Sequence, residues 1–207
     1  MNSICQTCQF SIKEKAFVYI LLYSRVRRGE ALALTKSDID LKNDEISINK
    51  ALAWNGNLPY VKEPKTYHSI RKIPIPDILK QILIEYVKNT TSFHLFANSY
   101  GELMTESQFR KLWRGIHDKI NIALGGVPGK RDRKTGRMVD GINAIQGLTP
   151  HTFRHNYATM LYYAGIDVKE AKRILGHSDI KTTLEIYTHL DKEKSGAANK
   201  LNKFIAI

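Results

Sequence analysis

Apolar residues repeat along the chain at spacings that predict helices over most of its length. Residues 11–24 (SIKEKAFVYILLYS) have a helical period with a wide apolar face, and residues 29–35 (GEALALT) continue as a second short helix. Amphipathic patterns predict two further helices, over residues 76–90 and 105–121. We therefore expect the first part of the chain to be built mainly from helices.

Polar and apolar residues alternate between the second and third of these helices. The alternation in residues 44–52 (DEISINKAL) and 60–75 (YVKEPKTYHSIRKIPI) predicts strands. We expect a short turn around residues 66–69 to join two strands into a hairpin. Lys65 would then lie at the tip of this hairpin.

Residues 124–148 differ from the rest because they are rich in glycine, lysine and arginine. This composition predicts a long, flexible, basic loop, and loops of such length in compact domains are usually functional or mobile. Capping residues then mark three helices. Thr149 with Pro150 suits the start of the first, Asp167 suits the start of the second, and the third follows over residues 179–190.

The order of helices, a small sheet and further helices predicts an α+β fold: a mostly helical domain with a small antiparallel β-sheet. With 207 residues, of which 43% are hydrophobic, the chain can bury one core. We expect a single domain over residues 1–207, with a tail at 191–207 that forms at most one weak helix.

The chain is strongly basic, with 32 Lys and Arg residues against 20 Asp and Glu and a formal net charge of +12. Such an excess favours a polyanionic partner, most often nucleic acid. The sequence has neither an apolar span of membrane length nor a signal peptide at its start. We therefore expect no membrane association and a cytoplasmic location.

The two cysteines, Cys5 and Cys8, form a single CxxC motif. A zinc site would need further ligands nearby, and a thioredoxin-like redox site would need a preceding strand; the neighbouring sequence offers neither. We expect a reduced, frayed N-terminal segment and no bound metal.

Several residues could handle a phosphate, although each also has an ordinary structural explanation. His151 and Arg154 are three residues apart, so they share one side of their helix, and His155 is close to them. Arginine binds phosphate with two parallel hydrogen bonds, and histidine can move a proton near neutral pH. A solvated helix face would explain these three residues equally well. Tyr187 alone would suit a half-buried core position.

Four motifs occur along the chain in the order SRVRRGE, PKTYHSIRKIP, HTFRHNYAT and LGHSDIKTTLEIYTH. Together they resemble the catalytic domain of the tyrosine recombinases, the family of phage and conjugative-transposon integrases that includes the Xer recombinases. The resemblance extends from about residue 15 to residue 190, and four separated motifs in order are highly specific. It implies the tyrosine recombinase fold, that of DNA breaking-rejoining enzymes.

The resemblance also implies six catalytic residues around one phosphate and two that support them. These are Arg27 and Arg154 clamping the scissile phosphate, His151 and His177 hydrogen-bonding it or moving protons, Lys65 protonating the departing 5′ oxygen, Tyr187 attacking phosphorus, and Glu30 and His155 as supporting neighbours. The implied product is a covalent 3′-phosphotyrosine, whose rejoining needs no ATP, metal or cofactor.

The implied partner is double-stranded DNA. The family resemblance further implies a homotetramer on paired recombination sites, with the tail at 191–207 docking onto a neighbour, although the lone domain could be a monomer in solution. We expect the N-terminal core-binding domain typical of the family to be absent, because few residues precede Arg27.

The chain departs from the family pattern at Arg25, where the family usually has glycine. If that position requires a left-handed backbone, arginine there costs about 1–2 kcal/mol. The family spacing to Glu30 identifies Arg27, rather than Arg25 or Arg28, as the catalytic arginine. Lys65 fits the PKT motif better than Lys62 or Lys72.

Three rival functions stay open at this point. Residues 63–65 (EPK) imitate part of a metal-dependent nuclease site, but the Pro-Asp pair at 76–77 follows this segment instead of preceding it. A type IB topoisomerase uses similar chemistry, and the small size of this chain favours a recombinase over it. A DNA-binding remnant with impaired catalysis is the third possibility, suggested by Arg25 and the missing domain.

Overall fold

The computed structural model describes residues 2–64, 69–131, 135, 138–139, 141–176 and 179–193. For residues 2–4, 130–131, 138–139, 154–156, 182 and 191–193 it describes only the backbone.

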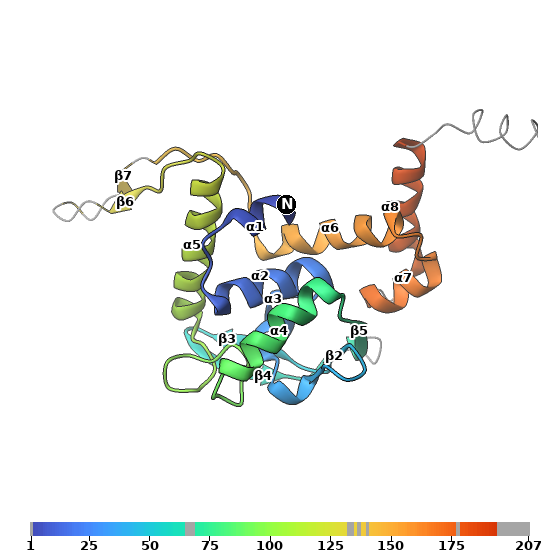
Figure 1. Ribbon diagram of the computed structural model, residues 1–207, viewed down its shortest axis with the longest axis horizontal. Coiled ribbons are helices and arrows are strands. Elements are labelled where there is room, and N and C mark those ends of the chain that lie inside the picture. The colour runs from blue at the N-terminus through green and yellow to red at the C-terminus, as the bar shows by residue number, and fades with distance from the viewer. Residues whose placement is uncertain are drawn as a thin grey trace, which may run out of the picture.

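The first three helices form the N-terminal part of the core. Helices α1 (Asn2–Thr7), α2 (Ile12–Ser24) and α3 (Arg28–Ala33) follow one another closely. Every residue of α2 from Ala16 to Ser24 is buried, because α2 packs between α4 (Asp77–Asn89) and α6 (Pro150–Tyr163) (Figure 1).

The predicted N-terminal fraying is wrong. Cys5 lies on α1, its side chain is 1% exposed, and it belongs to the main hydrophobic core. Helix α1 packs against α5 (Glu106–Ala123), which holds this segment in place. Both cysteines are free thiols, and burial raises the pKa of Cys5 to about 11. Cys5 therefore acts as a small apolar core residue.

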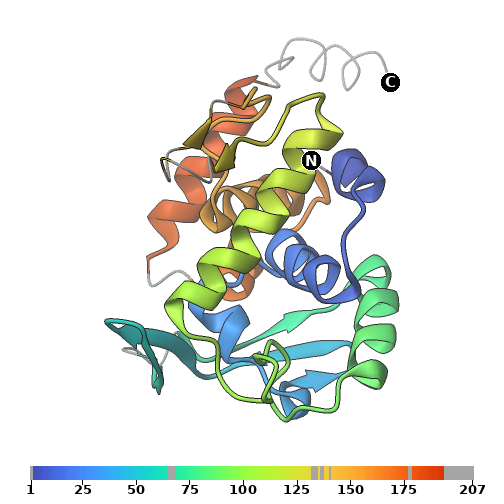
Figure 2. The same ribbon diagram turned by 90° about the vertical axis from the view of Figure 1, so that its left-hand side faces the viewer.

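Two small sheets lie beneath the helices. Strands β1 (Ile39–Asp40), β2 (Glu45–Ile48) and β5 (Arg71–Pro74) form an antiparallel sheet in the order β1-β2-β5. Strands β3 (Ala51–Asn55) and β4 (Leu58–Lys62) form a separate antiparallel hairpin. Figure 2 shows this hairpin extending past the edge of the molecule at its lower left.

The predicted hairpin around residues 66–69 is wrong in its pairing. The strands on either side of that segment, β4 and β5, belong to different sheets. The tight turn instead lies between Asn55 and Leu58, where Gly56 has a φ of 57°. An Asn-Gly pair between alternating residues favours such a turn, so the sequence contains this hairpin at a place where we did not predict one.

Helices α4 and α5 confirm the predictions for 76–90 and 105–121. The long segment after α5 contains the short pair β6 (Lys130–Arg131) and β7 (Met138–Val139). The buried side chain of Asn121 anchors its base, donating to the Ile142 carbonyl at 3.0 Å and accepting from the Ala144 N–H at 2.7 Å. The start and end of the segment are thus fixed to the helix that precedes it.

Helices α6, α7 (Val168–Leu175) and α8 (Ile180–Glu193) confirm the three helices predicted for the C-terminal part. Asp167 caps α7 by accepting from the N–H groups of Lys169 and Glu170, and Gly176 ends it with a φ of 62°. Helix α8 packs on α6 and α7 at the opposite end of the molecule from α5 (Figure 1). In the described part of the chain, no helix is both long enough and apolar enough to cross a bilayer.

Gly29 sets how closely α3 approaches β3. A Cβ added at Gly29 would lie 2.5 Å from the Leu52 carbonyl oxygen, which is backbone and cannot swing away. We predict that Gly29→Ala lowers the free energy of unfolding by about 1–3 kcal/mol, as overpacking does. Denaturant unfolding measures this directly.

Gly115 provides the matched control, because it lies inside α5, where an added Cβ would meet only the Glu14 carboxylate oxygen, at 3.4 Å. We expect Gly115→Ala to be neutral or stabilising by up to about 1 kcal/mol, since alanine favours a helix interior over glycine. Equal effects of the two substitutions would show that the contact between α3 and β3 is not tight.

Candidate active site

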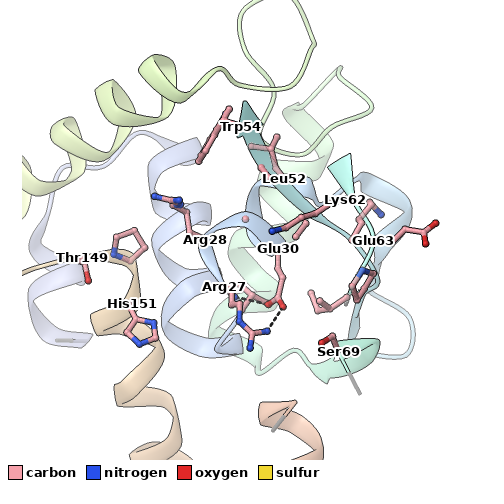
Figure 3. Close-up of a pocket in the computed structure, with 18 residues that line it drawn as sticks. Arg27, Arg28, Glu30, Leu52, Trp54, Lys62, Glu63, Ser69, Thr149 and His151 are labelled. Carbon is pink, nitrogen blue, oxygen red and sulfur yellow. Dashed lines mark hydrogen bonds and ion pairs between the residues drawn. The ribbon is translucent and has the colours of Figure 1, made fainter. Parts of the chain in front are cut away.

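A cavity of about 940 Å³ opens between the start of α3, the β3–β4 hairpin and the start of α6. Figure 3 shows Arg27 at its centre, His151 on the α6 side and Lys62 on the hairpin side. Arg28, Lys50 and Lys62 add further cations to its lining. The cavity therefore has the charge and the size to hold an anionic group.

Arg27 precedes the first residue of α3 and reaches the cavity from an extended backbone. Its backbone N–H donates to Glu30 Oε2 at 2.7 Å, and its Nη1 donates to Glu30 Oε1 at 3.0 Å. The Arg27 side chain is 54% exposed, whereas that of Glu30 is 6% exposed. Glu30 thus fixes one edge of the guanidinium, while more than half of the side chain stays accessible to a ligand.

Arg71, on β5, shares the same carboxylate. Its Nη2 donates to Glu30 Oε2 at 2.9 Å and its Nη1 to Glu30 Oε1 at 3.3 Å. Burial alone raises the pKa of Glu30, but the hydrogen bonds and charges of Arg71 and Arg27 outweigh it and hold that pKa below its ordinary range. Glu30 is therefore a buried, charged acceptor between two arginines.

Arg25 brings a third guanidinium to this region. Its φ of 49° lies in the left-handed region, the condition considered for this position because the family usually has glycine there. The residue is also buried. Burial, together with the charges of Arg27 and Arg71, lowers the pKa of Arg25 to about 10. Arg25 therefore adds a further positive charge close to Arg27 and Arg71.

His151 lies in the first turn of α6, and Thr149 and Pro150 place it at the cavity. Arg154 follows one turn later in the same helix, a spacing that puts both residues on one side. The side chains of Arg154 and His155 lie outside the described part of the structure. The structure thus brings Arg27, Glu30 and His151 to one cavity from distant parts of the sequence.

Lys65 and His177 lie outside the described residues, but the structure describes the residues on either side of the segments 65–68 and 177–178. Pro64 and Ser69, which bracket the segment containing Lys65, both line the cavity. Gly176, which precedes His177, packs against Arg71: a Cβ added there would lie 2.9 Å from Arg71 Cδ. The segments that carry the two predicted residues therefore end beside the Arg27–Glu30–Arg71 cluster.

Tyr187 lies apart from the cavity lining in this structure. Its hydroxyl donates to the Ile166 carbonyl at 3.1 Å, and its ring packs edge-on against Tyr162 with centroids 5.2 Å apart. The side chain is 6% exposed, and burial followed by the charge of Asp167 raises its pKa. The phenol is thus held in the α6–α8 packing, protonated and turned toward the protein.

The sequence assigned no place in the site to Arg71, and it identified Arg28 only as a possible anion-binding residue at a helix start. Arg71 alternates in step with the buried Ile73 along β5, and a charged residue at a core-facing position signals a buried partner. The Arg28 guanidinium lies over the rings of Trp54 and Phe109, at 5.0 and 5.2 Å from their centroids. Arg28 also lines a second hollow of about 520 Å³, beside Arg110, Arg114 and His117 of α5.

Comparisons with known proteins identify the family of this chain. The model of the phage integrase family matches residues 1–194. The chain is 30% identical to the ICEBs1 integrase of Bacillus subtilis strain 168, over 92% of this chain and 49% of that protein. It is 28% identical to a "Tyrosine recombinase XerC-like" protein of Caldanaerobacter subterraneus subsp. tengcongensis, over 91% of this chain and 49% of that protein.

Among solved structures, the chain is similar to the Tn1549 transposon integrase in complex with circular intermediate DNA. The TM-score is 0.70 with 26% identity, covering 90% of this chain and 59% of that one. The chain spans about half the length of the curated relatives it matches.

The left-handed backbone of Arg25 leads to a stability prediction. Glycine there removes a strain of about 1–2 kcal/mol and a buried cation beside two others, so we expect Arg25→Gly to raise the melting temperature. Asp44→Gly is the control, because Asp44 also has a positive φ, 56°, but pairs with Lys80 through a partly exposed side chain. Equal melting temperatures for Arg25→Gly and the native chain would contradict this prediction.

The low pKa of Glu30 leads to a pH prediction. A carboxyl whose folded pKa is lowered stabilises the fold above its unfolded pKa, about 4.3, and loses that contribution as the pH falls through the folded pKa. The stability gap between the native chain and Glu30→Gln should therefore be largest near pH 7 and shrink below about pH 4.3.

Denaturant midpoints at a series of pH values measure this gap. Glu45→Gln is the control, because the Glu45–Lys72 pair is exposed and should contribute little at any pH. A gap for Glu30→Gln that stays constant from pH 7 to pH 3 would show that the Glu30 charge is not what stabilises the cluster.

Proposed function

Because the chain belongs to the phage integrase family, we propose that it breaks and rejoins double-stranded DNA at specific sites, as a tyrosine recombinase does. The observation that carries this proposal is the meeting of Arg27 and His151, from α3 and α6, at one cavity lined with cations. The net charge of +12 supports a polyanionic partner. The relatives named above are called integrases and recombinases, and the Tn1549 integrase is bound to DNA.

In the proposed reaction, the Tyr187 oxygen attacks a backbone phosphorus and forms a phosphotyrosine bond while the P–O5′ bond breaks. The phenol proton passes to His151, and Lys65 protonates the departing 5′ oxygen. The reverse attack by a 5′-hydroxyl restores the DNA, so no bond energy is lost and no ATP is needed. The step requires no metal or cofactor, because fixed cations balance the charge.

Arg27 and Arg154 stabilise the transition state in this proposal, since extra negative charge develops on the equatorial phosphate oxygens. Removing one such donor typically costs about 10²–10³ in rate. His177 adds a hydrogen bond to the same phosphate, and His155 supports the α6 residues from behind. Glu30 keeps Arg27 directed at the cavity through the bonds described above.

Tyr187 has to leave its place in the α6–α8 packing before it can react. The hydrogen bond to Ile166 and the ring contact with Tyr162 must break. One neutral hydrogen bond contributes about 1 kcal/mol, an amount that DNA binding energy can offset. A buried phenol with a raised pKa is a poor nucleophile, so catalysis would wait for the rearrangement.

The alternative to this proposal is a DNA-binding protein that does not cleave; the relatives named above, which are called integrases and recombinases, do not favour it. Such a protein would use the cationic cavity for binding and keep the phenol as a core residue. The two candidates make opposite predictions about a covalent intermediate.

We further propose that residues 1–207 act as a single catalytic domain in the cytoplasm. Its active assembly would be a homotetramer on paired sites, with residues 191–207 docking onto a neighbour. Curated relatives are about twice as long as the matched region, so these proposals concern the part of the protein contained in this chain.

The decisive experiment traps the covalent intermediate. The protein is incubated in EDTA with a pool of nicked duplexes with randomised cores, and adducts that survive SDS are measured on a gel. We predict an adduct with the native chain and none with Tyr187→Phe, while salt-dependent DNA binding stays within about twofold because the phenol is not among the phosphate-binding cations.

Tyr163→Phe is the matched control, because Tyr163 is an exposed tyrosine on α6 near the same packing, and it should form the adduct normally. DNA binding without an adduct would favour the non-cleaving candidate. A parallel incubation contains Mg²⁺ in place of EDTA. Free DNA ends that appear only in that incubation would indicate a nuclease instead.

A further inference from the structure

We propose that Arg71 is a positioning residue that joins the three segments carrying Arg27, Lys65 and His177. This inference rests on the proposed function, because it concerns the geometry of the same site. Arg71 is not among the residues that line the cavity, and its side chain is 3% exposed. It therefore acts through its neighbours and does not touch DNA.

The first connection runs through Glu30 to Arg27. Arg71 binds both oxygens of the Glu30 carboxylate, at 2.9 and 3.3 Å. The same two oxygens accept from the Arg27 backbone N–H and from its Nη1. With both oxygens held by Arg71, the carboxylate plane has little freedom, and the guanidinium of Arg27 takes its orientation from that plane.

The second connection runs to the loop before β5. Arg71 Nη1 also donates to the Ser69 carbonyl oxygen at 3.1 Å. Ser69 lines the cavity and directly follows the segment 65–68. One guanidinium nitrogen thus contacts both the carboxylate that holds Arg27 and the end of the segment that contains Lys65.

The third connection runs to the end of α7. A Cβ added at Gly176 would lie 2.9 Å from Arg71 Cδ and 3.1 Å from Arg71 Nε, so the helix end rests on the arginine side chain. Helix α7 packs on β5 elsewhere as well. Gly176 directly precedes His177 in the sequence, so Arg71 contacts the last described residue before His177.

Stability alone does not explain an arginine at this place. Residues 71 and 73 of β5 are both buried and face the same side of the sheet, and the residue paired with Arg71 on β2 is Ile48. An apolar residue would therefore suit position 71. Replacing buried ion pairs by apolar residues of similar volume is often neutral or stabilising. Two positive neighbours also oppose it, since Arg25 and Arg27 lie nearby. The positioning of three site segments supplies a reason to keep the charge.

The test compares Arg71→Met and Arg71→Lys with Lys72→Met, a change of the exposed neighbour on the same strand. We expect the rate of adduct formation to fall about 10–100-fold for both Arg71 variants, and DNA binding to stay within about twofold. Arg71→Lys keeps the positive charge but cannot make the bidentate contact with the Glu30 carboxylate. It therefore tests the proposal even if Arg71→Met does not fold. Lys72→Met should match the native rate.

A double-mutant cycle separates positioning from general weakening of the fold. In an Arg27→Lys background, Arg71→Lys should lower the rate by a smaller factor than in the native chain, because the part of its effect that passes through Arg27 is already lost. A purely structural role would lower the rate by the same factor in both backgrounds, in step with the melting temperature. That additive result, or a native rate in Arg71→Lys, would overturn the proposal.

A second measurement does not depend on DNA cleavage. The Arg27 Nε–Hε signal in ¹H–¹⁵N NMR spectra of the free protein should shift or broaden in Arg71→Lys and stay in place in Lys72→Met. An unchanged Arg27 signal would refute the coupling. If the native chain formed no adduct, the proposed function would fail, while the NMR result would still decide whether Arg71 positions Arg27.

Discussion

The site depends on one buried carboxylate that two arginines share. Glu30 accepts from Arg27 and from Arg71, and burial makes each of these charged contacts stronger and costlier to break. Through Arg71 the same cluster reaches Ser69 and Gly176. The start of α3, Ser69 and the C-cap of α7 are therefore held relative to one another.

Two of the proposed phosphate-binding residues already lie at one cavity, whereas the proposed nucleophile lies apart from it. Arg27 and His151 already line the cavity, but Tyr187 is bonded to Ile166 within the helical packing. Such a separation suits an enzyme whose nucleophile should not act before its DNA is in place. Binding of the long, charged substrate supplies free energy that a local rearrangement of α8 can use.

Local chemistry made most of the helices predictable. Ser11, Thr105 and Asp167 cap their own helices through hydrogen bonds within three residues, so the sequence alone locates those ends. The left-handed backbone at Arg25 was also predictable, from the glycine expected there. The motif residues Arg27, Glu30 and His151 line one cavity, while the roles that the resemblance implies for them stay predictions.

Long-range contacts limited the rest. Strand pairing depends on contacts between segments that are far apart in the sequence. Strand β2 pairs with β5, and the β3–β4 hairpin lies between them in the sequence, so the pairing around residues 66–69 was mispredicted. The burial of Cys5 depends on α5, far along the chain. Arg71 lies in the PKTYHSIRKIP motif but received no role from the sequence, because its contacts with Glu30 and Gly176 appear only in the folded chain.

The most direct test of the account is the structure of this chain trapped on cleaved DNA with a nicked substrate. We predict one phosphate bonded to the Tyr187 oxygen and hydrogen-bonded by the Arg27 guanidinium, with Glu30 still between Arg27 and Arg71 and the Ile166 contact broken. A phosphate held by Arg27 while Tyr187 keeps its bond to Ile166, or a phosphotyrosine formed away from Arg27, would contradict the claim that one phosphate unites the site.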